Sequence, residues 1–209
     1  MSLGVKKRFF SSGKTFDISA IYALFLLISF LGWILEEVFF SLHDHVFSDR
    51  GFLSLPICVV YGISIMGTYF LFGLPHRMRF FSFSLPVSQR RTQKLVQTLL
   101  FILLAGVVCT FCELIVGLFL YGAFGFFMWD YRGIPFHFGP YICAPFALIW
   151  GILSFLFLRY LFLRLFLFFL KVRRETLWAV LLPLSIFLIL DISMNCTYSF
   201  CYRAHMALW

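Results

Sequence analysis

Several carboxylates interrupt long apolar stretches of the sequence, where charged residues are rare. They are Glu36, Glu37, Glu113 and Asp191. Placing one such side chain within a bilayer costs roughly 2.5–3.5 kcal/mol on insertion scales, and more if it is charged and unpaired. Two interpretations follow. The carboxylates either form ion pairs that hold helices together, or they line a polar cavity within the membrane.

Three of these carboxylates lie at similar depths. At 1.5 Å per residue, Glu36, Glu113 and Asp191 lie roughly 7, 12 and 14 Å from the C-terminal ends of their apolar stretches. They therefore occupy one shallow layer. Glu113 also shares a helical face with Gly106 and Gly117, and small residues on one face are typical of contacts between membrane helices.

The connections next to this layer carry charged and aromatic residues. Arg50 follows the first stretch, and the run Trp129-Asp130-Tyr131-Arg132 follows the third. Aromatic residues at this position are typical of a membrane interface, but the charges need a further explanation. Three or four acids exceed what the two arginines can neutralise, which favours a polar cavity over ion pairs alone. The candidate site residues are Glu36, Arg50, Glu113, Trp129, Asp130, Tyr131, Arg132 and Asp191.

The composition indicates what positions these residues. Of the 209 residues, 62% are hydrophobic and 12% are charged, against roughly 45–50% and 25% in soluble domains. A soluble core of this size could not hide so much apolar surface, and disordered, collagen-like and disulfide-scaffold proteins are excluded by the same numbers. The chain is predicted to be an integral membrane protein.

Five apolar stretches are long enough to cross about 30 Å of hydrocarbon. They are 18–40, 52–74, 95–121, 141–158 and 177–200. Since backbone groups cannot stay unpaired in lipid, and a β-barrel would need alternating segments, we predict an all-α bundle of about five transmembrane helices in a single domain, 18–203. The fourth helix has an ambiguous end, because basic residues interrupt 160–170 in a way that suits an interfacial helix or a snorkelling extension.

The basic residues predict the orientation. Of the 17 lysines and arginines, 14 fall in the N-terminal segment and in the second and fourth connections. By the positive-inside rule, the chain has a basic cytoplasmic N-terminus (1–17), an outer tail (204–209) and a place in the cell membrane. The net charge of +8 then reflects orientation, and we expect no nucleic-acid partner.

A weak internal repeat relates the two outer connections. Each precedes a stretch that opens with Ile-Cys, at Ile57-Cys58 and Ile142-Cys143, and continues to an aromatic residue followed by glycine, at Tyr61-Gly62 and Trp150-Gly151. One arrangement is therefore two parallel helical hairpins and one extra helix, with the repeat axis along the membrane normal.

An ordered series of motifs resembles a known family. The motifs are Gly32-Trp33-x-x-Glu36, Arg50-Gly51-Phe52-Leu53, Pro56, Tyr61-Gly62, Glu113, Trp129-Asp130-Tyr131, Pro135-Phe136, Ile142-Cys143, Trp150-Gly151 and Asp191. This series resembles the CmpB-like family of small polytopic bacterial membrane proteins, the ABC-transporter type IV permeases. The resemblance covers roughly 18–193 and implies a role in transport. Tyr141 stands where the family usually has an arginine.

Together these observations predict a permease-like transport subunit with a polar site in the outer half of the membrane. We expect no cofactor in this chain, ATP hydrolysis by a separate ATP-binding-cassette subunit, and a homo-oligomer, because five spans are few for a translocation path. We also expect no metal site, since exposed loop histidines such as His43 and His45 are common. The alternatives are a membrane enzyme acting on a lipid or wall precursor, with Glu36 or Glu113 as general base and Arg132 holding an anion, and a structural protein.

Overall fold

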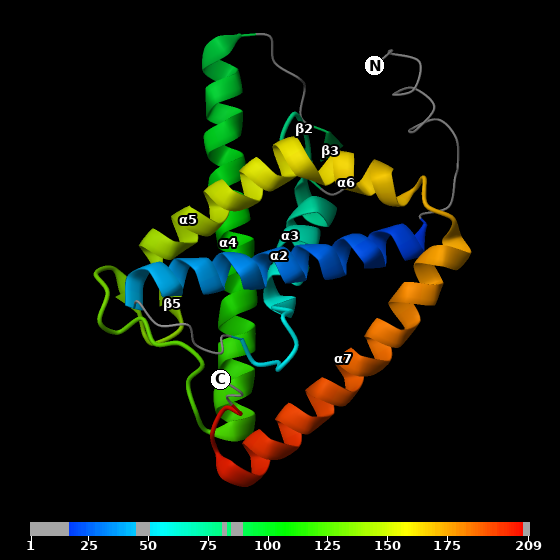
Figure 1. The fold of residues 1–209 in the computed structure, drawn as a ribbon. Coiled ribbons are helices and arrows are strands. Elements are labelled where there is room, and N and C mark those ends of the chain that lie inside the picture. The colour runs from blue at the N-terminus through cyan, green and yellow to red at the C-terminus, as the bar shows by residue number, and fades with distance from the viewer. Residues whose placement is uncertain (1–16, 45–50, 81–82, 85–89, 207–209) are drawn as a thin grey trace.

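The structure is a computed structural model that describes residues 17–44, 51–80, 83–84 and 90–206 (Figure 1). Its helices are α2 (Ile18–Asp44), α3 (Val59–Phe72), α4 (Arg91–Phe124), α5 (Ala144–Leu156), α6 (Phe162–Phe169) and α7 (Arg174–Tyr202). A π-helical turn, η1 (Phe157–Leu161), joins α5 to α6. In Figure 1, α2 and the α5–α6 helix run across α4 and α3, and α7 descends diagonally from the right toward the lower end of α4.

The helical membrane fold predicted from the composition is confirmed. Within the described residues, four helices are long and apolar enough to cross a membrane: Ile18–Phe39, Arg91–Phe124, Ala144–Phe169 and Arg174–Tyr202. The predicted fourth span therefore continues through η1 and α6 to Phe169, which supports the interpretation of its basic residues as part of a helical extension.

The second predicted span is shorter than its apolar stretch. Only Val59–Phe72, 14 residues, is helical, which at 1.5 Å per residue is about 21 Å. Gly51, with φ of 96°, and Pro56, which has no backbone N–H, begin a non-helical approach. Cys58 ends this approach by donating its backbone N–H to Ser29 O at 3.0 Å.

Short antiparallel strands lie between the helices, and two of them, at 73–74 and 142–143, fall inside stretches that we predicted as parts of membrane spans. The strands are β1 (Gly73–Leu74), β2 (Arg77–Phe80) and β3 (Phe83–Ser84), in the order β1-β2-β3, and β4 (His137–Phe138) with β5 (Ile142–Cys143). In the second pair His137 lies opposite Cys143, so the connection after α4 folds back directly onto the start of α5.

Small residues bring α4 and α5 into backbone contact. A Cβ atom on Gly106 would lie 2.5 Å from the carbonyl oxygen of Ala147, and one on Gly151 would meet the carbonyl oxygen of Ile102. Neither position can accept a larger side chain unless the helices separate. This is the close approach that small residues allow between membrane helices, and it fixes the face of α4 that carries Glu113.

Two apolar clusters hold the remaining helices together. The first cluster joins α2, α3, α4 and α6, and its members include Leu24, Ile28, Met66, Phe101 and Phe162. The second joins α2 to α7 and to the segment before α3 through Ala23, Leu26, Leu53, Ile57, Leu177, Leu181 and Leu188. A hydroxyl contact reinforces it, because Tyr22 Oη lies 2.8 Å from Ser185 Oγ.

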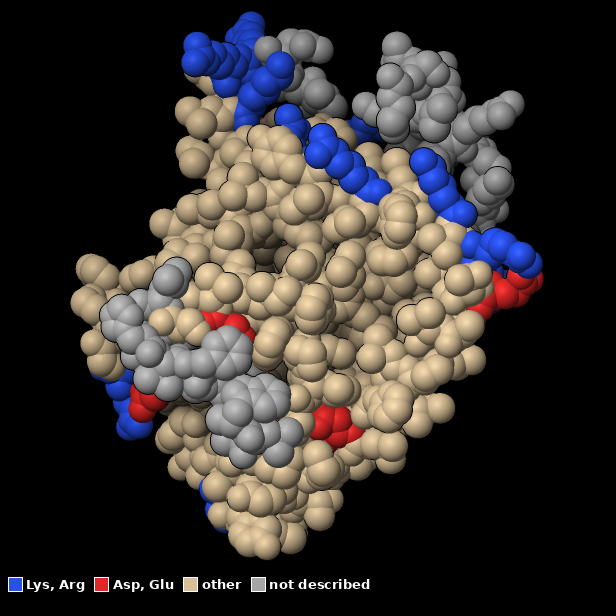
Figure 2. All heavy atoms as spheres, in the orientation of Figure 1, with Lys and Arg blue, Asp and Glu red and all other residues tan. Residues whose placement is uncertain are grey.

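The basic side chains gather at one end of the molecule. Figure 2 shows lysines and arginines along the upper end and an uncharged band below them. The elements that begin at this end include α4, whose first residue is Arg91, and α7, whose first residue is Arg174. Both α4 and α7 therefore run from the basic end toward an end with little positive charge.

Candidate functional site

A cavity of about 480 Å³ lies among α2, α3, α4, α5 and η1. Most of its lining is aliphatic or aromatic, and the polar side chains in it are Tyr61, Ser64, Cys109, Glu113, Trp150, Ser154 and Tyr160. Glu113 is the one charged residue of this lining among the described residues. The cavity thus combines an apolar interior with a single carboxylate.

Helical spacing aims these side chains at the cavity. Cys109 and Glu113 are one turn apart on α4, and Trp150 and Ser154 are one turn apart on α5, so each pair shares a face. Cys109 Sγ lies 3.3 Å from Ser154 Oγ, which links the two helices beside the cavity. Because Gly106 lies on the same face of α4, the close α4–α5 contact places both pairs against each other.

Two aromatic rings stand beside Glu113. Tyr61 and Trp150 meet edge to face, with ring centroids 5.4 Å apart. Trp150 Nε1 is buried and makes no regular hydrogen bond with the residues that the structure describes. The Glu113 carboxylate and the Tyr131 hydroxyl nevertheless both interact with this indole N–H electrostatically.

Glu36 and Tyr131 extend the cluster around Glu113. The Glu36 carboxylate acts electrostatically on Glu113 and accepts a hydrogen bond from the Cys58 thiol. Tyr131 stacks on Phe146 with centroids 5.1 Å apart. Burial raises the pKa of Tyr131, and the carboxylates of Glu113 and Glu36 act in the same direction. The structure therefore brings together three of the predicted site residues, from α2, α4 and the connection after α4.

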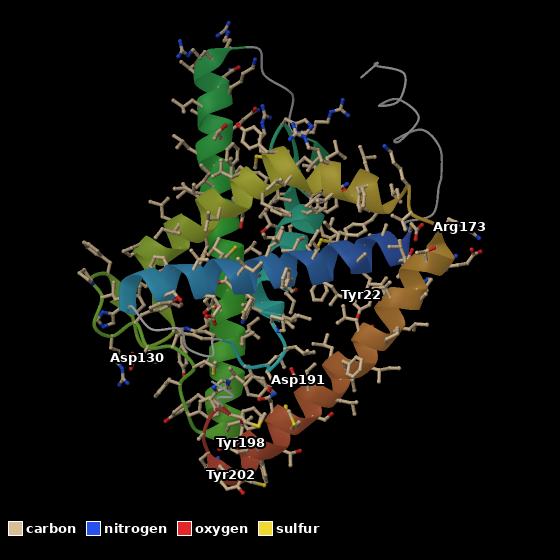
Figure 3. All side chains as sticks on the ribbon, in the orientation of Figure 1. Tyr22, Asp130, Arg173, Asp191, Tyr198 and Tyr202 are labelled. Atoms are coloured by element: carbon tan, nitrogen blue, oxygen red, sulfur yellow. The ribbon has the colours of Figure 1, made fainter. Side chains whose placement is uncertain are left out.

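Asp191 lies apart from this cluster and has a different role. Its Oδ1 accepts the backbone N–H of Ser54 at 3.3 Å and the Asn195 side-chain amide at 2.9 Å, while its Oδ2 accepts the backbone N–H of Leu55 at 3.0 Å. Only 7% of Asp191 is exposed. In Figure 3, Asp191 faces the segment that leads into α3, far from Asp130. Asp191 therefore fixes the non-helical backbone before α3.

Asp130 and Arg132 pair with each other at the surface. Arg132 Nη2 lies 2.5 Å from Asp130 Oδ2, and the two side chains are 37% and 59% exposed for Asp130 and Arg132 respectively. Hydrogen bonds from Arg132 hold the pKa of Asp130 down at about 2. Arg132 also lies over the Phe127 ring at 5.3 Å. The interpretation in which Arg132 neutralises a buried carboxylate is therefore wrong.

The remaining candidates are separated from the cavity or lie outside the described residues. Trp129 Nε1 donates to Tyr141 O at 3.4 Å, and the Trp129 ring packs close to Gly117, so Trp129 anchors the connection onto α4. Arg50 lies outside the described residues, as do the N-terminal residues 1–16 and the tail residues 207–209.

Sequence reasoning did not include Tyr61, Trp150 or Tyr160 among the site residues. Two of them were visible in the internal repeat, as the aromatic residues of Tyr61-Gly62 and Trp150-Gly151. The structure places these repeated positions in direct contact, beside Glu113. An aromatic residue at matching positions of two hairpins was therefore the available signal, and only the fold shows that the rings meet.

The fold and the cavity define the class of protein: a multi-pass helical membrane protein with a carboxylate-bearing cavity among its helices. The family then follows from the sequence. Residues 23–196 match the family described as "Putative ABC-transporter type IV" (ABC_trans_CmpB), and the chain belongs to it. Searches of curated proteins and of solved structures found no match.

Proposed function

We propose that the chain is a permease-like membrane transport subunit whose solute-binding site is the cavity beside Glu113. The observation that carries this proposal is a cavity of about 480 Å³ among helices of the membrane domain, with a carboxylate in its lining. Cavities at contacts between helices are where ligands bind in helical bundles. Ionisable residues inside a membrane domain commonly mark solute or ion pathways, and membership of the family supports the same role.

The orientation that we propose has a cytoplasmic N-terminus and an outer C-terminus, because the basic residues gather at one end of the fold. Glu113 is 11 residues from the end of α4 at Phe124 and 22 from its start at Arg91, so the site lies in the outer half of the membrane. A reporter that is active only in the cytoplasm, fused after Trp209, should give no signal. A strong signal there would reverse the orientation.

Two partners belong to the proposal. The sequence carries no nucleotide-binding motif, so energy from ATP would come from a separate ATP-binding-cassette subunit docked on the basic end. A homo-oligomer supplies a second copy of the few membrane helices, so that a translocation path can form between copies.

The structure does not bring together the residues that the enzymatic alternative requires. It needs Glu36 or Glu113 as a general base and Arg132 as the residue that binds an anionic substrate. Arg132 instead pairs with Asp130 at the surface, and it is not among the groups that act on Glu113. The structure therefore offers less support for an enzyme than for a transport subunit.

A deletion strain tests the proposed function. The deletion strain is complemented with the wild-type gene, with Glu113→Gln or with Glu175→Gln. Mass spectrometry then compares the concentrations of small molecules in the cells and in the medium. Glu175 pairs with Arg173 and its side chain is 81% exposed, so Glu175→Gln removes one negative charge far from the cavity. We expect the deletion to change the distribution of a solute between cells and medium. The wild-type gene and Glu175→Gln should restore the original distribution, and Glu113→Gln should not.

Two results would contradict the proposal. An unchanged solute distribution in the deletion strain would argue against transport, and a chemically altered compound in place of a redistributed one would favour an enzyme. A thermal melt of purified Glu113→Gln protein must match the parent, so that a loss of function is not a loss of folding.

A further inference from the structure

The lining of the cavity restricts the ligands that can occupy it. Apart from Glu113, the cavity wall is formed almost entirely by aliphatic and aromatic surface. A polar group transferred to such a surface without a hydrogen-bond partner loses several kcal/mol. Sugars and free amino acids are therefore a poor fit. The cavity volume, about 480 Å³, lies within the range of roughly 300–1,000 Å³ that small organic ligands occupy.

The charge of the cavity selects a cation. Glu113 makes no ion pair with any residue that the structure describes, and no lysine or arginine contributes to the described lining. Glu36 adds a second carboxylate within electrostatic reach. A half-buried carboxylate among apolar side chains is stabilised by a compensating charge, and a cationic group on the ligand can provide it.

The aromatic residues beside Glu113 favour an organic cation over an inorganic one. Tyr61 and Trp150 both line the cavity, and their rings are in contact. Aromatic faces attract ammonium groups within about 6 Å of the ring centroid. In contrast, the described residues contain no group of three His, Cys, Asp or Glu side chains that could hold a metal ion.

A second, independent feature of the cavity is the π-helical turn in its wall. Phe157, Tyr160 and Leu161 of the π-helical turn η1 line it. Single π-helical turns within α-helices are rare and occur frequently at functional sites. Here the turn interrupts an otherwise continuous helix and presents apolar side chains to the cavity, on a different element from the one that carries Glu113.

We propose that the cavity binds a small amphiphile that carries one cationic amine, with its ammonium group at Glu113 and its apolar body against η1. This inference rests on the proposed function, since it names the class of solute for the same site. Glu113 is the one carboxylate in the described lining and sets the position of the ammonium group, and the apolar wall sets the hydrophobic body.

Binding of 4-phenylbutylamine to the full-length protein in nanodiscs of neutral lipid tests the proposal. The uncharged 4-phenylbutanol is the matched ligand, and titration calorimetry with empty nanodiscs gives the background. We expect saturable binding of the amine and at least tenfold weaker binding of the alcohol. Glu113→Gln should weaken amine binding at least tenfold and leave alcohol binding unchanged, while Glu175→Gln should bind both ligands like the parent.

A second variant tests the location of binding without changing the carboxylate. Leu31 lines the cavity and is 38% exposed, so Leu31→Trp adds bulk there at small risk to folding. It should weaken binding of both ligands. Unchanged binding in Leu31→Trp would overturn the assignment to this cavity. Equal affinity for the amine and the alcohol, or no saturable binding of the amine, would overturn the proposed class of ligand.

The binding experiment and the deletion-strain experiment can refute the two proposals separately. If the amine does not bind while Glu113→Gln still abolishes solute redistribution, the transport proposal stands and the class of solute is wrong. If the amine binds as expected while the deletion changes no solute distribution, the site is a binding site and the transport proposal is wrong.

Discussion

Replacement of Asp191 by asparagine should destabilise the protein without a direct effect on the cavity. Asp191 accepts three hydrogen bonds, from two backbone N–H groups at Ser54 and Leu55 and from the amide of Asn195. Asparagine keeps the shape but has one acceptor oxygen, so its NH₂ group must face one of these donors. At least one buried donor then loses its acceptor.

The magnitude follows from the hydrogen bonds lost. A hydrogen bond to a charged group contributes roughly 1.5–3 kcal/mol, and Asp191→Asn removes at least one and weakens the others. We therefore expect a loss of about 3 kcal/mol, which corresponds to a fall in melting temperature of roughly 6–12 °C for a chain of this size. The fall is expected in Asp191→Asn and not in Asp130→Asn, since Asp130 is a surface carboxylate.

The assay is thermal unfolding of the purified variants in a mild detergent. A double-mutant cycle with Asn195→Ala should show coupling, because both residues belong to one hydrogen-bond network. If Asp191→Asn melts within about 1 °C of the parent, the carboxylate does not hold the segment before α3, and the reasoning from its hydrogen bonds is refuted.

Three further predictions concern other contacts of the fold. Gly106→Leu should prevent the close approach of α4 to α5 and abolish the folded protein in detergent extracts, and a folded variant would contradict the backbone contact. Arg132→Ala should leave the melting temperature unchanged and raise the pKa of Asp130 from about 2 toward its ordinary value of 3.8, as followed by carbon NMR between pH 2 and 6. In the parent, the Asp130–Arg132 pair should persist above this low pKa and be lost as the pH falls through it. Tyr22→Phe should cost about 0.5–1.5 kcal/mol by removing the hydroxyl contact with Ser185, and a variant as stable as the parent would show that this contact does not join α2 to α7.

The sequence predicted the helical elements because lipid leaves few alternatives. Continuous apolar runs of sufficient length must satisfy their own backbone hydrogen bonds, so the helical class and the long spans were accessible from hydropathy. The limits of α3 were not accessible from hydropathy. Gly51 lies directly before the apolar run 52–74 and Pro56 lies inside it. Hydropathy does not show that these two residues, together with the hydrogen bonds of Asp191, keep the backbone non-helical.

The candidate site was predictable in part. Helical spacing placed Glu113 on the same face as Gly106, and that face packs on α5 as small residues predict. The partners of Asp191 were not accessible, because backbone N–H groups from a segment more than 130 residues away leave no pattern of residue types. The sequence left the partner of Arg132 open, because it cannot distinguish a buried carboxylate from Asp130, two residues away in a connection that turns back on itself.

The shortness of α3 has a consequence for how the protein is made. Its 14 residues leave about 9 Å of a 30 Å hydrocarbon core unspanned, and Ile63 and Phe70 are its exposed residues. A segment that is too short and is covered by protein on most sides gains little from lipid. We therefore expect α3 to enter the bilayer together with α2 and α4, so that a nascent chain truncated before α4 fails to integrate it. Tyr61 of α3 would then reach its place beside the cavity only once α4, which carries Glu113, has also entered the bilayer.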